Sequence, residues 1–199
     1  MTQLNSLNDV LVEQIADLQS AEQQLITALP NMAQAASDNK LREAFQTHLE
    51  ETRGHADRLT KVVGMLGGSV PAEECQAMKG LIAEGEDVIN ATGDPAAKDA
   101  ALIAAAQRVE HYEMAGYGCA RTYARLLGLD DDAKLLQQTL NEEGETDHLL
   151  TAIAERAINV EALVGDRTVG RGVERDADVG SRGSSGGGKR RGTDSEARQ

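Results

Sequence analysis

The stretch GGSVPAEECQAMKGLIAEGEDVINATGD, residues 67–94, decides the fold, because it separates two pairs of predicted long helices. Apolar residues at helical spacing predict a short helix within it, over about residues 72–91. The two long helices before it, and the two after it, are joined by only about three residues, and such short links make antiparallel neighbours. The chain is therefore predicted to fold as two antiparallel helical hairpins joined by one long crossover.

Capping and breaking residues give the bounds of the four long helices. Ser6 is a predicted N-cap, and Pro30 is expected to kink the first helix near its end. Pro95 occupies the first position of the third helix, and Gly128 ends that helix. No stretch alternates apolar and polar residues as a half-buried strand does. The sequence thus predicts an all-α, ferritin-like four-helix bundle with a short extra helix in the crossover, and its long helices are expected at about 7–36, 39–66, 95–127 and 130–163.

Residues 165–199 differ in composition from the rest of the chain, being rich in Gly, Ser and Arg with almost nothing apolar. Such a segment cannot bury enough surface to offset its loss of entropy on ordering, so we expect a disordered tail after a bundle of residues 1–164. The tail contains 8 Lys/Arg and 6 Asp/Glu, which leaves 12 and 27 for residues 1–164 and gives them a net charge of −15. So acidic a bundle argues against nucleic acid as the main partner and suits the handling of cations, although a solvated surface would have the same charge.

The N-terminal sequence MTQLNSLNDV lacks a basic region followed by an apolar run, so no signal peptide is expected. No apolar segment approaches the roughly 20 residues needed to span a bilayer. Cys75 and Cys119 have no CxxC spacing and are expected to be reduced, buried small hydrophobic residues. These features favour a cytoplasmic protein without a membrane partner.

Each predicted long helix places carboxylates on its apolar face, when its positions are projected at about 100° per residue. An unpaired carboxylate is costly to bury in ionised form, and divalent cations remove this cost by neutralising several carboxylates at once. Carboxylates with histidines in a four-helix bundle are typical of a dinuclear centre. We therefore predict a site for two divalent metal ions, with iron first and manganese or zinc as alternatives. Its candidate ligands, from the first to the fourth long helix, are Glu22; His48, Glu51 and His55; Glu110 and Glu113; and Glu143 and Asp147.

Particular roles are predicted for a few residues of this site. Glu51 and Glu143 belong to different hairpins and are the candidates for bridging the two metals. The other carboxylates and one of the two histidines would be terminal ligands or would bond to the ligands. Tyr117 is predicted in the core, with its hydroxyl near the site as a hydrogen-bond donor. Gly116 and Gly118 each cost about 1 kcal/mol relative to Ala inside a helix, which indicates a close approach of two helices.

A second pattern imitates a ligand pair. Glu145 and His148 have the Glu-x-x-His spacing found in di-iron helices, yet both lie about 120–180° from the apolar stripe of their helix. We expect them in solvent. His111 is displaced by about 100° from Glu110, which makes it a poor candidate ligand.

Taken one at a time, the candidate ligands have simpler interpretations. Glu22 alone could be a boundary residue whose carboxylate reaches solvent, and either histidine could be an ordinary core residue. Glu110 and Glu113 could form a surface charge pair, and Asp147 could bond to a ligand rather than to a metal. Their coincidence on all four long helices is what favours a metal site.

Five segments resemble the YciE/YciF-like family of bacterial ferritin-like proteins: SAEQQLITALPNMAQAA (20–36), HLEETRGHADRL (48–59), CQAMKGLIAEGEDVI (75–89), AAQRVEHYEMAGYG (105–118) and TLNEEGETDHLL (139–150). The resemblance covers about residues 4–163, and EHYE-x-x-x-Y with its distance from NEE-x-x-x-D is its most specific part. It implies a ferritin-like fold, a dinuclear centre such as di-iron, a homodimer and a bacterial stress response. Position 55 is often glutamine in relatives, and neither the second nor the fourth helix carries Glu-x-x-His on its core face. The family's metal-site positions match Glu22, His48, Glu51, Glu110, Glu113, Glu143 and Asp147.

Three functions are consistent with these features. The first is oxidation of Fe(II), or reduction of peroxide or oxygen, at the dinuclear site. The second is that of a non-catalytic, stress-associated helical interaction protein whose site is structural or vestigial. The third is an iron-storage assembly, for which no residue indicates a cage of subunits. The sequence leaves open whether the protein is an enzyme.

Overall fold

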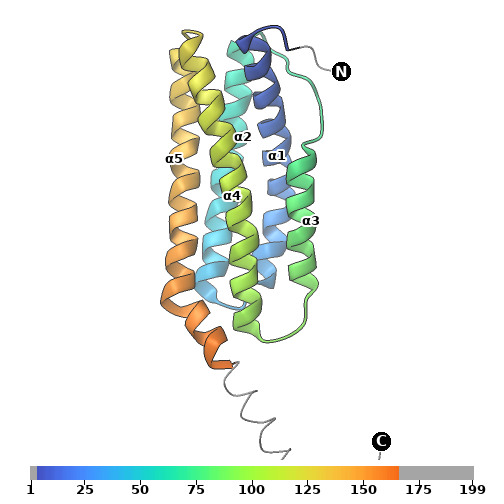
Figure 1. Cartoon of the computed structure of the whole chain (residues 1–199), viewed down its shortest axis with the longest axis vertical. Helices are drawn as coiled ribbons and strands as arrows, with labels where there is room; N and C mark the ends of the chain where they lie inside the picture. Colours follow the sequence, from blue (N-terminus) through green and yellow to red (C-terminus); the bar gives the residue numbers. More distant parts are fainter. Residues whose placement is uncertain (1–3, 166–199) are drawn as a thin grey trace, which may run out of the picture. The chain divides into compact units, whose positions relative to one another are not determined.

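Four long helices and one shorter helix form the fold, and the computed structural model describes residues 4–165 (Figure 1). No strand occurs among these residues. The predicted tail lies, except for Gly165, outside the described residues. The helices are α1 (Leu7–Ala35), α2 (Asn39–Met65), α3 (Gln76–Asn90), α4 (Pro95–Leu126) and α5 (Asp130–Ile153), and α5 continues through a π-helical turn, η1 (Ala154–Ile158), into helical residues 159–165.

The long helices form two antiparallel hairpins, α1–α2 and α4–α5, as the short links predict. The bundle is closed because α2 packs against α5 and α1 packs against α4. The crossover carries α3, which lies outside the bundle against α1 and α4 (Figure 1). The fold is therefore the predicted ferritin-like four-helix bundle. Within residues 4–165, no helix combines the length and apolar character needed to cross a membrane.

Side chains at the helix starts explain where the hairpins begin and how they meet. Ser6, Asp38 and Asp94 cap α1, α2 and α4 by accepting hydrogen bonds from backbone N–H groups. Asp99 of α4 is buried and accepts hydrogen bonds from the backbone N–H of Ser37 at 2.9 Å and of Asp38 at 2.7 Å. These bonds tie the α1–α2 turn to α4 and so join the two hairpins at one end.

Helix α3 begins at Gln76, later than the residue 72 that apolar periodicity predicts. The backbone N–H of Cys75 donates to Ser20 of α1 at 2.9 Å, and Gln24 of α1 donates to the Cys75 carbonyl at 3.1 Å. These long-range bonds hold Cys75 in an extended conformation, so the helix starts after it. The predicted burial is right for Cys75 and wrong for Cys119, which is exposed, and both thiols are free.

The glycines inside α4 differ in their surroundings. A Cβ atom added at Gly116 would lie 2.8 Å from Leu18 Cδ2, so α1 and α4 approach closely at this point. A Cβ atom at Gly118 would meet nothing within 4 Å. The predicted close approach is therefore correct for Gly116 and wrong for Gly118, because the two residues face different directions around the helix.

The apolar core consists of two clusters of buried side chains, and every long helix contributes to both. Each helix passes from one cluster to the other through a buried polar segment, such as Glu22 between Leu18 and Leu25 on α1. The polar segments of the four helices therefore meet in the middle of the bundle. One cluster includes Leu25, Phe45, Leu102 and Leu150, and the other includes Leu18, Leu59, Tyr117 and Leu136.

Candidate metal centre

Six buried side chains form a layer between the two apolar clusters, and we call it the central polar layer. None of them is more than 3% exposed. Four are carboxylates and two are histidines, and no Lys or Arg is among the buried side chains of residues 4–165. The layer therefore contains more negative groups than its own side chains can neutralise. Its members are Glu22 of α1, His48 and His55 of α2, Glu110 and Glu113 of α4, and Glu143 of α5.

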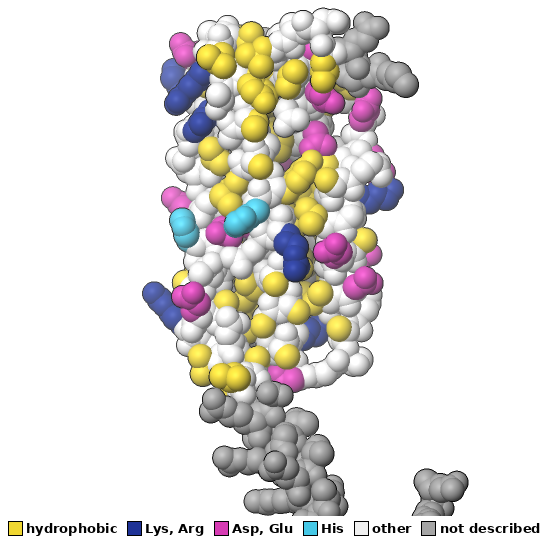
Figure 2. Space-filling view, viewed as in Figure 1, with side chains coloured by type: hydrophobic (Ala, Val, Ile, Leu, Met, Phe, Trp, Pro, Cys, Tyr) yellow, Lys and Arg dark blue, Asp and Glu magenta, His cyan; other side chains and the backbone are white. Residues whose placement is uncertain are grey.

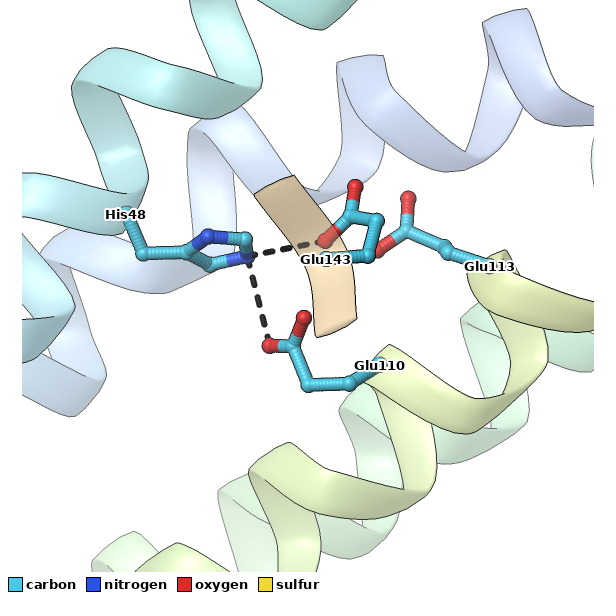
Figure 3. Close-up of side chains that lie close together, drawn as sticks. All are labelled: His48, Glu110, Glu113 and Glu143. Atoms are coloured by element: carbon cyan, nitrogen blue, oxygen red, sulfur yellow. Dashed lines mark ion pairs between the residues drawn. The ribbon is translucent and has the colours of Figure 1, made fainter. Parts of the chain in front are cut away.

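Four of these side chains converge on one point of the layer (Figure 3). His48, Glu110, Glu113 and Glu143 each offer a ligand atom, and these atoms all lie within 4.8 Å of one another. The Nε2 atom of His48 is 3.2 Å from Glu110 Oε1 and 3.8 Å from Glu143 Oε2. These side chains belong to α2, α4 and α5, and in Figure 3 they point toward one another, as ligands of a common ion would.

A second group lies beside the first and shares one carboxylate with it. Glu22, His55 and Glu143 also have ligand atoms within 4.8 Å of one another. The Nδ1 atom of His55 is 2.8 Å from Glu143 Oε1 and 3.4 Å from Glu22 Oε1. Glu143 thus directs Oε1 toward the second group and Oε2 toward the first. A carboxylate with this arrangement is suited to bridging two cations, which is the role predicted for Glu143.

The polar atoms of this layer are arranged as ligands of cations rather than as hydrogen-bond partners of one another. Eight of its nitrogen and oxygen atoms have no hydrogen-bond partner, including both oxygens of Glu113 and of Glu143. The His55 Nδ1 atom is one of them, although Glu143 Oε1 is only 2.8 Å away. These atoms are close together without the geometry of hydrogen bonds. Because buried polar groups are normally hydrogen-bonded, the donor set fits a pair of divalent metal ions.

Several groups of the central polar layer hold protons when no cation is bound, and a cation would have to displace these protons. Burial raises the pKa of Glu110 well above its usual value, and the Glu143 carboxylate raises it further. Burial and the nearby Glu22 carboxylate have the same effect on the pKa of Glu113. Burial lowers the pKa of His55, but the adjacent Glu143 and Glu22 carboxylates outweigh this and raise the pKa to about 10. Without a cation, protons therefore hold the layer together, and a metal would compete with them.

Two predicted ligands, Glu51 and Asp147, lie outside both groups. The Glu51 side chain is 37% exposed, and its Oε2 atom is 3.5 Å from His48 Nδ1, the ring nitrogen that faces away from Glu110. The Asp147 side chain is 17% exposed and accepts a hydrogen bond from Gln107 at 3.0 Å. Both carboxylates border the central polar layer, and neither belongs to a group of ligand atoms within 4.8 Å of one another.

The surface histidines lie where the helical projection places them. His111 and His148 are exposed, as is Glu145, so the predicted exposure of the Glu-x-x-His pair is confirmed. Figure 2 shows histidine side chains on the outer surface of the bundle, beside acidic side chains. The Nε2 atom of His111 lies 3.3 Å from Asp147 Oδ1 at the edge of the site. It does not take part in either group of candidate ligands.

Several neighbours complete the site, and sequence reasoning identified only one of them. The buried hydroxyl of Tyr117 donates a hydrogen bond to Glu22 Oε1, as predicted. Glu142 and Arg58 were missed, although Glu142 bonds to His55 and to Arg58. The available signal was the spacing of Arg58, one turn after His55 on the same helix.

Comparison with known proteins identifies a family and a relative that match nearly all of the described residues. The family described as "Domain of unknown function (DUF892)" matches residues 6–163. Protein YciF of Escherichia coli is 45% identical over 160 residues, which cover 80% of this chain and 96% of YciF.

Two solved structures share the fold over most of their length. The crystal structure of the E. coli stress protein YciF matches with a TM-score of 0.76 and covers 78% of this chain and 99% of that chain. YcfI from Rhodopseudomonas palustris, a proposed structural protein, is 37% identical, with a TM-score of 0.72 and coverage of 75% and 95%. The resemblance to YciF-like proteins is therefore confirmed, and the chain belongs to the DUF892 family.

Proposed function

We propose that this protein holds two divalent metal ions in its central polar layer and uses them in redox chemistry. Iron is the preferred metal and manganese the redox-active alternative, because the donors are mostly carboxylate oxygens with one imidazole at each position. Zinc could occupy the same donors, but it has no redox chemistry and would make the centre structural. The observation that carries the proposal is Glu143, which belongs to both groups of candidate ligands and has no hydrogen-bond partner for either oxygen.

The residues divide into two sets of ligands. His48, Glu110 and Glu113 would hold one metal, Glu22 and His55 would hold the other, and Glu143 would contact both. The Tyr117 hydroxyl fixes the orientation of the Glu22 carboxylate by donating to Oε1, which leaves Oε2 for a metal. The two apolar clusters exclude water from the ends of the layer and so strengthen its electrostatic interactions.

Bound iron would supply one-electron redox chemistry and a Lewis acid at the centre of the bundle. The reaction we infer is oxidation of Fe(II), or reduction of peroxide or oxygen, in a stress response. E. coli YciF is called a stress protein, which supports the physiological setting but not the reaction itself. The chain itself would hold the ions, exclude water and determine which carboxylates carry a proton.

Metal content is the first measurement. Protein purified without added metal or chelator should contain about two metal ions per chain by elemental analysis, and the Glu143→Gln variant should lose at least one of them. Glu145→Gln is the matched control, because Glu145 is exposed on the same helix. Absence of metal after anaerobic loading with Fe(II) would contradict the proposal. If metal is present, Fe(II) oxidation no faster than that of free iron would leave a metal protein without this activity.

A non-catalytic, structural role in a stress response is the second candidate. It is supported by the His55–Glu143–Glu22 cluster. Without a metal, a protonated His55 would balance the Glu143 carboxylate, and burial raises the pKa of Glu22 and so favours its neutral form. The description of YcfI as a proposed structural protein points the same way. In this case neither wild type nor Glu143→Gln would show measurable turnover, and the substitution would change only the melting temperature.

The assembly separates a third candidate, iron storage, from these two. We expect a homodimer, as the resemblance to YciF-like proteins implies. Sedimentation of the full chain distinguishes the two cases, because a dimer cannot enclose a mineral core whereas a storage cage requires many subunits.

A further inference from the structure

We propose that Glu142, held by Arg58, positions His55 so that its Nδ1 atom is the metal-binding nitrogen. This inference rests on the proposed metal centre and deepens it. It assigns a positioning role to two residues, Glu142 and Arg58, that do not contact the candidate metal positions.

The two ring nitrogens of His55 face different carboxylates. The Nε2 atom lies 3.0 Å from Glu142 Oε2 and makes a hydrogen bond with it. The Nδ1 atom lies 2.8 Å from Glu143 Oε1 and has no hydrogen-bond partner. A carboxylate can only accept from a ring N–H, so the bond to Glu142 keeps a proton on Nε2. A metal would then displace the proton that Nδ1 holds beside Glu143 in the metal-free protein and bind to the Nδ1 lone pair.

Glu142 is itself fixed by three donors, which keeps it from acting as a ligand. Arg58 donates to Oε2 and Gln138 donates to Oε1 at 3.0 Å, so both oxygens are occupied in addition to the bond with His55. Arg58 is anchored in turn, because its Nε donates to Thr139 at 2.9 Å. The neighbouring Glu143 differs in that neither of its oxygens has a hydrogen-bond partner. Adjacent glutamates on α5 thus have separate functions, since one would bind metal and the other would orient a ligand.

The other histidine lacks an equally rigid partner. The outer nitrogen of His48, Nδ1, lies 3.3 Å from the Thr146 hydroxyl and 3.5 Å from Glu51 Oε2. Glu51 makes no ion pair with an arginine or lysine of residues 4–165, and its side chain is the more exposed of the two outer carboxylates. The orientation of His55 should therefore depend on Glu142 more strongly than that of His48 depends on Glu51.

Nitrogen NMR of the full-length protein loaded with Zn(II) tests the assignment. In ¹⁵N-labelled wild type we expect His55 to coordinate through Nδ1, with a proton on Nε2. Calorimetric titration with Zn(II) should show affinity at one of the two positions falling about 10–100-fold in Glu142→Ala, with a smaller loss in Glu142→Gln, which keeps an acceptor. Glu145→Ala, at an exposed position of α5, is the matched control and should bind as wild type does.

The outcomes separate this inference from the proposed function. If wild type binds no Zn(II) and no Fe(II), the metal centre itself is refuted. If wild type binds two Zn(II) ions but His55 coordinates through Nε2, or Glu142→Ala binds both ions with unchanged affinity, only the role of Glu142 is refuted. The wild-type spectrum decides the coordinating nitrogen even if Glu142→Ala fails to fold.

Discussion

At the scale of single residues, burial of the Glu113 carboxylate destabilises the metal-free fold. Glu113 is fully buried, and neither carboxylate oxygen has a hydrogen-bond partner. Folding the metal-free protein at neutral pH must therefore bury a charge or take up a proton. Glu113→Gln requires neither, so we expect its metal-free form to melt about 2–4 °C above wild type, which corresponds to about 1 kcal/mol for a domain of this size.

Calorimetry at pH 7 in the presence of a chelator measures this effect, with Glu145→Gln as the exposed control. The same Glu113 variant should bind metal more weakly, because it lacks one carboxylate of the first group. A lower melting temperature in the metal-free state would show that Glu113 stabilises the fold by itself.

The sequence predicts which side chains face the interior of the bundle better than it predicts how deeply each of them is buried. The helical projection correctly directs Glu22, Glu110 and Glu143 toward the interior, because each lies on the stripe of buried apolar residues of its helix. Glu143, for example, lies two turns from both Leu136 and Leu150 on that stripe. It directs Glu51 and Asp147 the same way, yet their side chains stop at the edge of the layer. How deep such a position lies depends on the distance and rotation of the neighbouring helix, which one helix's own sequence does not specify.

At the scale of helices, the two glycines of α4 give opposite predictions. Gly118→Ala should stabilise the protein by about 1 kcal/mol, because Ala favours the helix and its Cβ would meet open space. Gly116→Ala should instead destabilise it by about 1–3 kcal/mol, because the new methyl group would press on Leu18, which is buried in the core. Urea denaturation of the metal-free variants measures both changes. Equal effects of the two substitutions would show that α1 and α4 are not closely packed at Gly116.

The crossover shows which element bounds a sequence can give. Its length alone predicts the topology, because about thirty residues cannot form a tight turn between antiparallel helices. The start of α3 cannot be predicted locally, because Cys75 just before it donates a hydrogen bond to Ser20 and accepts one from Gln24, and both partners lie on α1. Local helix propensity therefore predicts that α3 exists, whereas tertiary contacts determine the residue at which it begins.

At the scale of the whole molecule, a bound metal pair would connect the two hairpins. The candidate ligands come from α1 and α2 on one side and from α4 and α5 on the other, so an unfolded chain would lose them together. Metal binding should then raise the melting temperature of the whole bundle in one transition. At free metal about 100 times the dissociation constant, the gain is about 2.7 kcal/mol, or about 5–10 °C, and it should be much smaller in Glu143→Gln.

The pH dependence of this stabilisation follows from the groups in the central polar layer. Glu22, Glu110 and Glu113 have raised pKa values, mainly because of burial, so the metal-free native state binds more protons than the unfolded chain as pH rises above 4.5. The pKa of His55, at about 10 against 6.5, acts in the same direction up to about pH 10. Burial raises the pKa of Glu143, but the positive charge of the adjacent His55 outweighs burial and lowers it, so Glu143 is largely ionised in both states above pH 5 and adds little slope.

Stability of the metal-free protein should therefore fall as pH rises from 5 to 8, since the native state binds the extra protons. A metal replaces those protons, so its affinity and its effect on the melting temperature should increase over the same range. Calorimetry at pH 5, 6.5 and 8, with chelator and with Zn(II), measures both trends. A metal-free melting temperature that rises between pH 5 and 8 would mean that the buried carboxylates are neutralised in some other way, and the case for a cation in this layer would lose its electrostatic basis.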